Sequence, residues 1–207
     1  PVDEGEERIS MSFNVFACGD IGELNFKKAT LVERWTMSSI KITDNFLDKD
    51  SFNKFKNFIM GNEFAWHYNP FVDYEDDHGE YFQFTHIFYG FNLPSSSYYN
   101  DIVPILEGLN YYSLARVKAN LLTKTSKILV NDFHTDETEF TTKQMKQWTT
   151  SIFYINTNNG YTEFKDGTII DSVANRMVTF PMNMKHRGTS CTNEKIRVVI
   201  NFNYYSK

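Results

Sequence analysis

The 207-residue chain is poor in the residues that mark several structural classes. Its two cysteines, Cys18 and Cys191, are too few for a disulfide framework or a structural zinc site. Only 10 glycines and 5 prolines stand against 41% hydrophobic residues, so the composition excludes disordered and low-complexity proteins. No apolar run approaches the roughly 20 residues of a membrane helix, and the first residues are acidic, unlike a secretory signal. These absences predict a globular, soluble and cytoplasmic protein with no membrane partner.

Positive charge is also scarce, because 26 Asp and Glu residues outnumber 21 Lys and Arg residues. Proteins that bind nucleic-acid phosphates normally carry a basic patch, so the net charge of −5 argues against a nucleic-acid partner. Aromatic residues, in contrast, are abundant at 16%. The length suits one sizeable domain, with room for at most a fragment of another.

The hydrophobic pattern changes its period along the chain. Apolar residues at helical spacing, with Asp48 or Asp50 as the cap, predict a helix over 48–59, and a second stripe predicts a helix over 97–109. From about Leu114 the apolar residues alternate with polar ones, which predicts strands. The expected strands are 114–122, 127–133, 148–155, 161–164, 168–171, 177–180 and 196–204, with Arg187-Gly188 as one of the turns between them. Many short strands after a helical start predict a mainly β fold, a jelly roll (double-stranded β-helix) core with N-terminal flanking helices.

Other conspicuous segments are interpreted as structural. His67 and His86 stand in aromatic surroundings and are expected to pack there, and the aromatic run over 81–91 is expected to form core or a sheet edge. The acidic segment 73–80 lacks calcium-loop spacing and is predicted to be a solvated loop near a substrate entrance. Arg116 and Lys118 either meet an acidic substrate or form a solvated strand face, and the sequence leaves both open.

The strongest set of chemistry-bearing residues is His134 and Asp136, with His186 following 50 residues after the aspartate. Residues i and i+2 of a strand project to the same face, so the first two can present an imidazole and a carboxylate to one ion. A jelly roll can fold His186 back beside them. Two histidines and one carboxylate on one side of a metal, with open positions opposite, suit non-haem Fe(II) oxygenases. A hydrogen-bonded surface pair is the alternative interpretation of His134 and Asp136.

Five short motifs follow one another over roughly 114–205. They are Phe133-His134-Thr135-Asp136, Phe153-Tyr154-Ile155-Asn156, Gly160-Tyr161-Thr162-Glu163-Phe164, His186-Arg187-Gly188 and Arg197. In this order they resemble the 2-oxoglutarate- and Fe(II)-dependent dioxygenases. The resemblance is to the prolyl-4-hydroxylase-like branch and, within it, to the small members carried by marine phages, whose compartment would be the host cytoplasm.

This resemblance implies roles by position. His134, Asp136 and His186 would bind Fe(II), Arg197 would pair with the far carboxylate of 2-oxoglutarate, and Tyr154 would donate its hydroxyl to the same carboxylate. Asn120 and Thr162 would line the cosubstrate pocket. Strand alternation places further lining residues on the faces of Arg197 and Tyr154: Val199, Asn201 and Asn203, and Trp148, Thr150 and Ile152. O2 is the implied oxidant, and ascorbate is a candidate accessory reductant.

The implied activity is hydroxylation of a peptidyl prolyl residue or a small molecule, with release of succinate and CO2. Asp136 stands where related halogenases have a small residue, which favours hydroxylation over halogenation. Two alternatives stay open. One is a non-catalytic jelly-roll module, either a metal- or ligand-binding protein or a phage structural protein. The other is a nucleic-acid demethylase, which the negative charge disfavours.

The two ends of the chain resemble each other. Arg8-Ile9-Ser10-Met11-Ser12-Phe13-Asn14 aligns with Arg197-Val198-Val199-Ile200-Asn201-Phe202-Asn203, the segment that carries the implied cosubstrate arginine. We therefore expect residues 1–22 to be the C-terminal strand remnant of a preceding, similar domain plus a linker. The dioxygenase domain is then expected to occupy residues 23–207.

Overall fold

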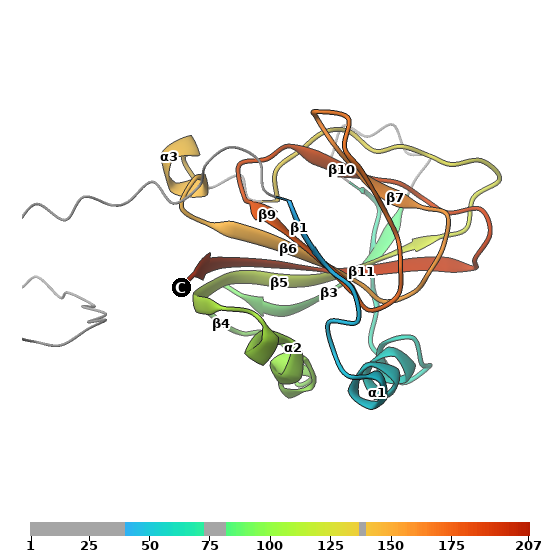
Figure 1. Ribbon diagram of the computed structural model, residues 1–207. Coiled ribbons are helices and arrows are strands. Elements are labelled where there is room, and N and C mark those ends of the chain that lie inside the picture. The colour runs from blue at the N-terminus through green and yellow to red at the C-terminus, as the bar shows by residue number, and fades with distance from the viewer. Residues whose placement is uncertain (1–39, 73–81, 137–139) are drawn as a thin grey trace, which may run out of the picture. The chain divides into compact units, whose positions relative to one another are not determined.

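The computed structural model describes residues 40–72, 82–136 and 140–207 (Figure 1). These residues belong to one compact unit, Trp35–Lys207. The expected strand remnant over 1–22 and the acidic segment 73–80 lie outside the described residues, so both stay predictions. No helix in the described part of the chain is long and apolar enough to span a membrane.

Two antiparallel sheets form the body of the domain. Among the described residues, the larger sheet has eight strands in the order β1-β9-β6-β11-β5-β3-β2, with β4 paired to β3, and the smaller has three in the order β10-β7-β8. The larger sheet contains β1 (Lys41–Thr43), β2 (His67–Asn69), β3 (Gln83–Gly90), β4 (Leu93–Pro94), β5 (Tyr111–Thr123), β6 (Thr149–Tyr154), β9 (Arg176–Pro181) and β11 (Ile196–Ser206). The smaller contains β7 (Tyr161–Phe164), β8 (Ile169–Asp171) and β10 (His186–Gly188). The predicted jelly-roll fold class is confirmed.

The helices α1 (Lys49–Ile59) and α2 (Val103–Gly108) lie on one side of the larger sheet, and the smaller sheet lies on the other (Figure 1). Helix α1 begins where predicted, because the Asp48 carboxylate accepts hydrogen bonds from the first-turn amides. The second predicted helix is split into the 3-10 turn η1 (Tyr99–Ile102) and α2 (Val103–Gly108), with Pro104 in the first turn of α2. A short α3 (Thr142–Met145) was not predicted.

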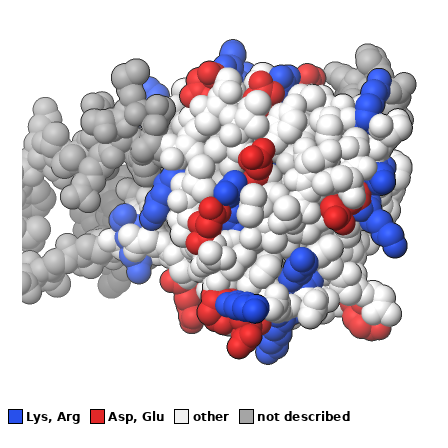
Figure 2. Space-filling view, turned by 45° about the vertical axis from the view of Figure 1, so that its right-hand side comes forward, with Lys and Arg blue, Asp and Glu red and all other residues white. Residues whose placement is uncertain are grey.

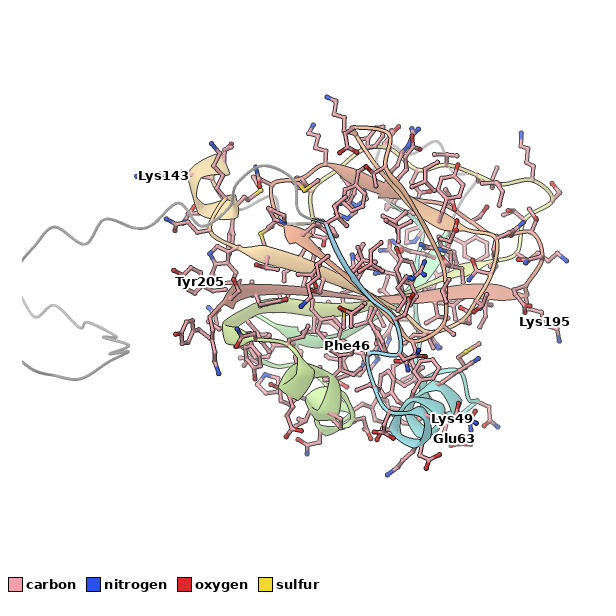
Figure 3. The ribbon with its side chains drawn as sticks, viewed as in Figure 1. Phe46, Lys49, Glu63, Lys143, Lys195 and Tyr205 are labelled. Carbon is pink, nitrogen blue, oxygen red and sulfur yellow. The ribbon has the colours of Figure 1, made fainter. Side chains whose placement is uncertain are left out.

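Each face of the larger sheet buries its own apolar cluster. The cluster on the helix side joins α1 and α2 to β5, β6 and β11. Phe46, labelled in Figure 3, belongs to this layer, with its ring 5.8 Å from that of Phe153 on β6. The cluster on the other side joins Tyr154 and Val199 of the larger sheet to Phe164 and Ile170 of the smaller one. The two sheets are thereby held face to face, and the space left between them contains the site described below.

Two local predictions are wrong. The segment 127–133 is not a strand, because among the described residues it makes only isolated bridges, Val130 to Thr189 and His134, just beyond it, to His186. Its apolar content does not mark burial, since Val130 is 41% exposed. Arg187-Gly188 is not a turn but part of β10, which pairs with β7.

His86 confirms the expectation of ordinary packing. Its Nδ1 donates to the Ala65 carbonyl and its Nε2 accepts from the Ser96 hydroxyl, both at 2.7 Å. The rings of Phe64 and Phe88 lie 4.6 and 4.8 Å away. Burial lowers the pKa of His86 below 6.5, against the opposing effect of the Ala65 hydrogen bond.

We expect this histidine to make the metal-free protein less stable in acid. The unfolded chain takes up the proton more readily, so the contribution of His86 is full above about pH 6.5 and is lost as the pH falls through its lower folded pKa. Urea unfolding at pH 7 and pH 5 measures the change. His86→Gln keeps a donor and an acceptor but does not titrate, so its free energy of unfolding should change less between pH 7 and pH 5. An equal change in the two proteins would show that His86 is not the group responsible.

Candidate metal centre and cosubstrate pocket

A cavity of about 380 Å³ lies between the larger sheet, the smaller sheet and the segment around His134. The strands β5 and β11, which pair with each other, form one wall of the cavity. Asn120 pairs with Val199, and Lys118 pairs with Asn201. The lining residues are Val72, Gln83, Arg116, Lys118, Asn120, Leu122, Asn131, His134, Thr135, Asp136, Ile152, Thr162, His186, Gly188, Arg197, Val199 and Asn201.

His134, Asp136 and His186 meet at this cavity. One nitrogen or oxygen from each lies within 4.8 Å of the others. The bridge between the two histidines holds them together, because each backbone N–H donates to the other's carbonyl at 3.0 Å. At metal–ligand bond lengths of about 2.0–2.2 Å, two atoms on one ion are at most about 4.4 Å apart, so small side-chain shifts allow all three to share an ion.

Both histidines are held in the tautomer that suits a metal ligand. Nδ1 of His134 lies 3.0 Å from the Asp132 carbonyl, and Nδ1 of His186 lies 3.2 Å from the Met184 carbonyl. A carbonyl only accepts, so both Nδ1 atoms carry the hydrogen, and Nε2 is the nitrogen that carries the lone pair in this tautomer. Burial lowers the pKa of His186, although the Asp136 charge opposes it, so the ring is neutral at pH 7.

The Asp136 side chain is 3% exposed, and both of its oxygens accept hydrogen bonds. Asn201 Nδ2 donates to its Oδ1 and Asn203 Nδ2 to its Oδ2, both at 3.0 Å. Burial alone would raise the pKa of Asp136, but the charges of His186, Arg116 and His134 and the Asn203 hydrogen bond outweigh it and bring the pKa to about 2. The carboxylate is therefore ionised and ready to bind a cation.

Arg197 supplies a buried positive charge to the same cavity. It is 4% exposed; its Nε donates to Ser172 Oγ at 2.9 Å, and its Nη2 lies 3.4 Å from Tyr161 O and Thr162 Oγ1. Over the described ranges, no Asp or Glu oxygen lies within 4 Å of this guanidinium. Burial lowers the pKa of Arg197, yet a guanidinium stays charged at neutral pH. An uncompensated buried cation is costly, so this end of the cavity favours an anion.

Some of the remaining predicted residues line the cavity and others do not. Asn120, Thr162 and Asn201 line the cavity, as do Ile152 and Val199. Tyr154 is fully buried and donates its hydroxyl to Thr162 Oγ1 at 2.7 Å. Trp148 does not line the cavity; its ring packs against those of Phe140 and Tyr205, the latter labelled in Figure 3 at the end of β11.

Some residues at the site were missed by sequence reasoning. Arg187 donates to Glu163 Oε2 at 2.9 Å, and its guanidinium carbon lies 4.1 Å from the centre of the Phe133 ring. These contacts tie β10 and β7 to the residue before His134. Gln83, at the start of β3, lines the cavity and donates to the Phe71 and Val72 carbonyls. Their partners lie 11 or more residues away in sequence, so no local pattern signals these roles.

Gly160 makes room for Arg197. A Cβ at this position would lie 2.7 Å from Arg197 Cδ and from the Ser190 carbonyl oxygen. For 2-oxoglutarate, the cosubstrate that the sequence resemblance implies, we expect Gly160→Ala to displace the guanidinium and weaken binding about 10-fold, equivalent to about 1.4 kcal/mol. Calorimetric titration of the metal-loaded protein measures this. The matched control is Gly90→Ala at the end of β3, which does not line the cavity and whose Cβ would lie 3.3 Å from Ile87 Cγ2; an equal loss in both variants would contradict the explanation.

No protein-family model matches this sequence, and no curated protein matches it. Solved structures do match its fold. Viral collagen prolyl hydroxylase vCPH from Paramecium Bursaria Chlorella virus-1, in complex with 2OG, is 13% identical with a TM-score of 0.53, over 83% of this chain and 98% of that one. A prolyl hydroxylase from Trichoplax adhaerens, in complex with a hypoxia inducible factor peptide fragment, is 11% identical with a TM-score of 0.55, over 82% and 84%.

HygX from Streptomyces hygroscopicus, with nickel and 2-oxoglutarate bound, is 7% identical with a TM-score of 0.52, over 81% of this chain and 83% of that one. At these identities the likeness is one of fold. The chain therefore has the jelly-roll fold that is also found in these prolyl hydroxylases and this 2-oxoglutarate-binding protein.

Proposed function

We propose that this chain is an Fe(II)- and 2-oxoglutarate-dependent dioxygenase that hydroxylates its substrate. One observation carries the proposal: a single cavity holds a His-Asp-His cluster and a buried arginine that has no carboxylate partner among the described residues. The first suits a divalent metal and the second suits a carboxylate. A small dicarboxylate that binds a metal at one end and a guanidinium at the other satisfies both.

At the cluster, the side chains would hold Fe(II) through the two Nε2 atoms and the Asp136 carboxylate. Two histidines and one carboxylate leave coordination positions open for other ligands. Bound Fe(II), together with 2-oxoglutarate and O2, supplies oxidising chemistry that amino-acid side chains lack. The protein's contribution is to keep the His186 imidazole neutral, to orient both imidazoles, to keep Asp136 ionised, and to limit access of water between the sheets.

At the other end, Arg197 would bind the far carboxylate of 2-oxoglutarate through its planar fork of N–H donors. Asn201, the residue that contacts Asp136, lies four positions after Arg197, and this spacing corresponds to about 13 Å along an extended strand. The arginine side chain and a five-carbon diacid together span such a distance. Thr162 Oγ1 already accepts from Tyr154, so its own hydrogen is left to donate toward the cavity. Tyr154 would therefore act on the carboxylate through Thr162.

The substrate is proposed to be a peptidyl prolyl residue or a small molecule. The Trichoplax adhaerens neighbour holds a peptide, which supports the first. Nucleic acid remains disfavoured, because on the face shown in Figure 2 the Lys and Arg side chains are interspersed with Asp and Glu and form no continuous basic area. The resemblance to phage-carried members and the 23–207 domain boundary stay predictions.

Anaerobic absorption spectroscopy and product assays test the proposal. Adding Fe(II) and 2-oxoglutarate without oxygen should give a weak visible charge-transfer band, which His134→Ala should abolish. Adding O2 and a substrate panel, with and without ascorbate, should then release succinate. No band at saturating ligand would overturn the proposal, whereas a band without succinate across prolyl peptides and small molecules would favour the non-catalytic binding module.

A further inference from the structure

Two asparagines on β11 donate hydrogen bonds to the Asp136 carboxylate, one to each oxygen. Asn201 Nδ2 donates to Oδ1 and Asn203 Nδ2 donates to Oδ2, each at 3.0 Å. They are two residues apart on one strand, so they face the same way. Asn203 is also braced, because its Nδ2 reaches Thr150 Oγ1 at 3.0 Å on the neighbouring strand β6. The carboxylate is thus held by side chains 65 and 67 residues away in sequence.

These two hydrogen bonds leave the amide oxygens of the same asparagines without partners among the described residues. The Oδ1 atoms of both asparagines are buried and have no hydrogen-bond partner within the described part of the chain. A buried acceptor without a partner is destabilising, because it has lost its hydrogen bonds to water and gained none in the protein. Turning either amide by 180° would place its oxygen against a negatively charged carboxylate oxygen. Asp136 therefore fixes the orientation of both asparagine amides. An apolar side chain would fill these positions without that cost, which indicates that the amides serve the carboxylate rather than the packing.

The two carboxylate oxygens differ in what surrounds them. Oδ1 lies 3.7 Å from His186 Nε2, the atom that would share a metal with it. Oδ2 is bound by Asn203, which is completely buried and braced by Thr150. Asn203 therefore holds Oδ2. Oδ1 accepts from Asn201, lies 4.0 Å from Arg116 Nη2, and is the oxygen on the side of the histidines, where its second lone pair can bind a cation.

We propose that Asn201 and Asn203 are positioning residues that fix Asp136 to coordinate the metal through Oδ1 alone. This inference rests on the proposed function, because it takes the cluster to be a metal site. A carboxylate that bound through both oxygens would fill one of the positions that cosubstrate and substrate need. The asparagines would thereby keep the open side of the metal open, and their hydrogen bonds would limit rotation of the carboxylate.

Titration with Co²⁺, an air-stable stand-in for Fe(II), tests the inference without any turnover. Asn203→Leu keeps the volume and removes the donor. We expect its Kd for Co²⁺ to rise about 10- to 100-fold, the usual loss when a partner of a metal ligand is removed. The visible bands of bound Co²⁺, which report coordination number and symmetry, should also change. Asn201→Leu should weaken binding in the same direction.

The matched control is Ser151→Ala. This residue neighbours Thr150 on β6 and faces the opposite side of the sheet, where its hydroxyl makes hydrogen bonds with the hydroxyls of Thr179 and Tyr204. Its loss should lower the melting temperature but leave Co²⁺ affinity and the visible bands unchanged. A merely structural role for Asn203 would give the same result as this control, and that result would overturn the inference.

Two further outcomes are separable. If the unaltered protein binds no Co²⁺, the proposed metal site fails, and the inference fails with it. If it binds Co²⁺ and Asn203→Leu binds it with equal affinity and identical bands, only the inference fails. Should circular dichroism show that Asn203→Leu is unfolded, Thr150→Val removes the brace alone. A smaller rise in Kd with altered bands would then support the inference, and no change would overturn it.

Discussion

Arg197→Met is expected to stabilise the ligand-free protein while it weakens binding of 2-oxoglutarate by about 100-fold or more. The guanidinium is buried with no acidic partner among the described residues, so replacing it with an apolar side chain of similar length removes a desolvation penalty. We expect a gain of about 1–3 kcal/mol in the free energy of unfolding. The same change leaves a cosubstrate carboxylate buried without its partner, which costs about 2–5 kcal/mol of binding.

These opposite signs distinguish a binding residue from a structural one. Chemical unfolding gives the stability, and calorimetry with 2-oxoglutarate on the metal-loaded protein gives the affinity. Arg197→Lys keeps the charge but loses the planar fork, so its affinity should lie between those of the other two proteins. A variant that loses stability and keeps its affinity would show that Arg197 supports the sheet and binds no carboxylate.

Strand alternation predicted the part of the fold on which the site is built. β5, β6 and β11 bury one face against the helices and present the other to the cavity. The alternation of apolar and polar residues is clearest in β5, whereas β6 is buried along its whole length. β7 was predicted with its observed bounds. Alternate residues of a strand share one face, so the position of Arg197 on β11 also predicted that Val199 and Asn201 lie on the same face. Both residues do line the cavity.

What the sequence could not predict depends on pairing between distant segments. The residues before His134 look like a strand by composition, yet they are held by two isolated bridges and by the contacts of Arg187 with Phe133 and Glu163. Alternation put Asn203 on the correct face, but nothing local says that it grips Asp136, because the hydrogen bond joins residues 67 apart. Tyr154 is similar: its hydroxyl goes first to Thr162, and only the folded chain shows this.

Asp136→Ala is expected to abolish metal binding and, with it, all conversion of 2-oxoglutarate. Asp136 is the only carboxylate in the described cluster, and its pKa of about 2 keeps it charged throughout the pH range of an assay. Its removal leaves two imidazoles without an anionic ligand, so the affinity for the metal should fall by more than the roughly 10- to 100-fold that losing a ligand's hydrogen-bond partner costs. The Asn201 and Asn203 amides also lose their shared acceptor, which we expect to destabilise the metal-free protein by about 1–3 kcal/mol.

Thermal unfolding with and without metal separates these two effects of Asp136→Ala. A ligand that binds only the folded state, present at about 100 times its Kd, adds about 2.7 kcal/mol of stability. The unaltered protein should therefore melt higher with Co²⁺, whereas Asp136→Ala should melt lower than it in both conditions and show no increase. Asp101→Ala, which removes an exposed carboxylate at η1, should retain the full increase. A metal-dependent increase of equal size in Asp136→Ala would mean that the ion binds elsewhere, and the His-Asp-His cluster would then be a hydrogen-bonded group and no metal centre.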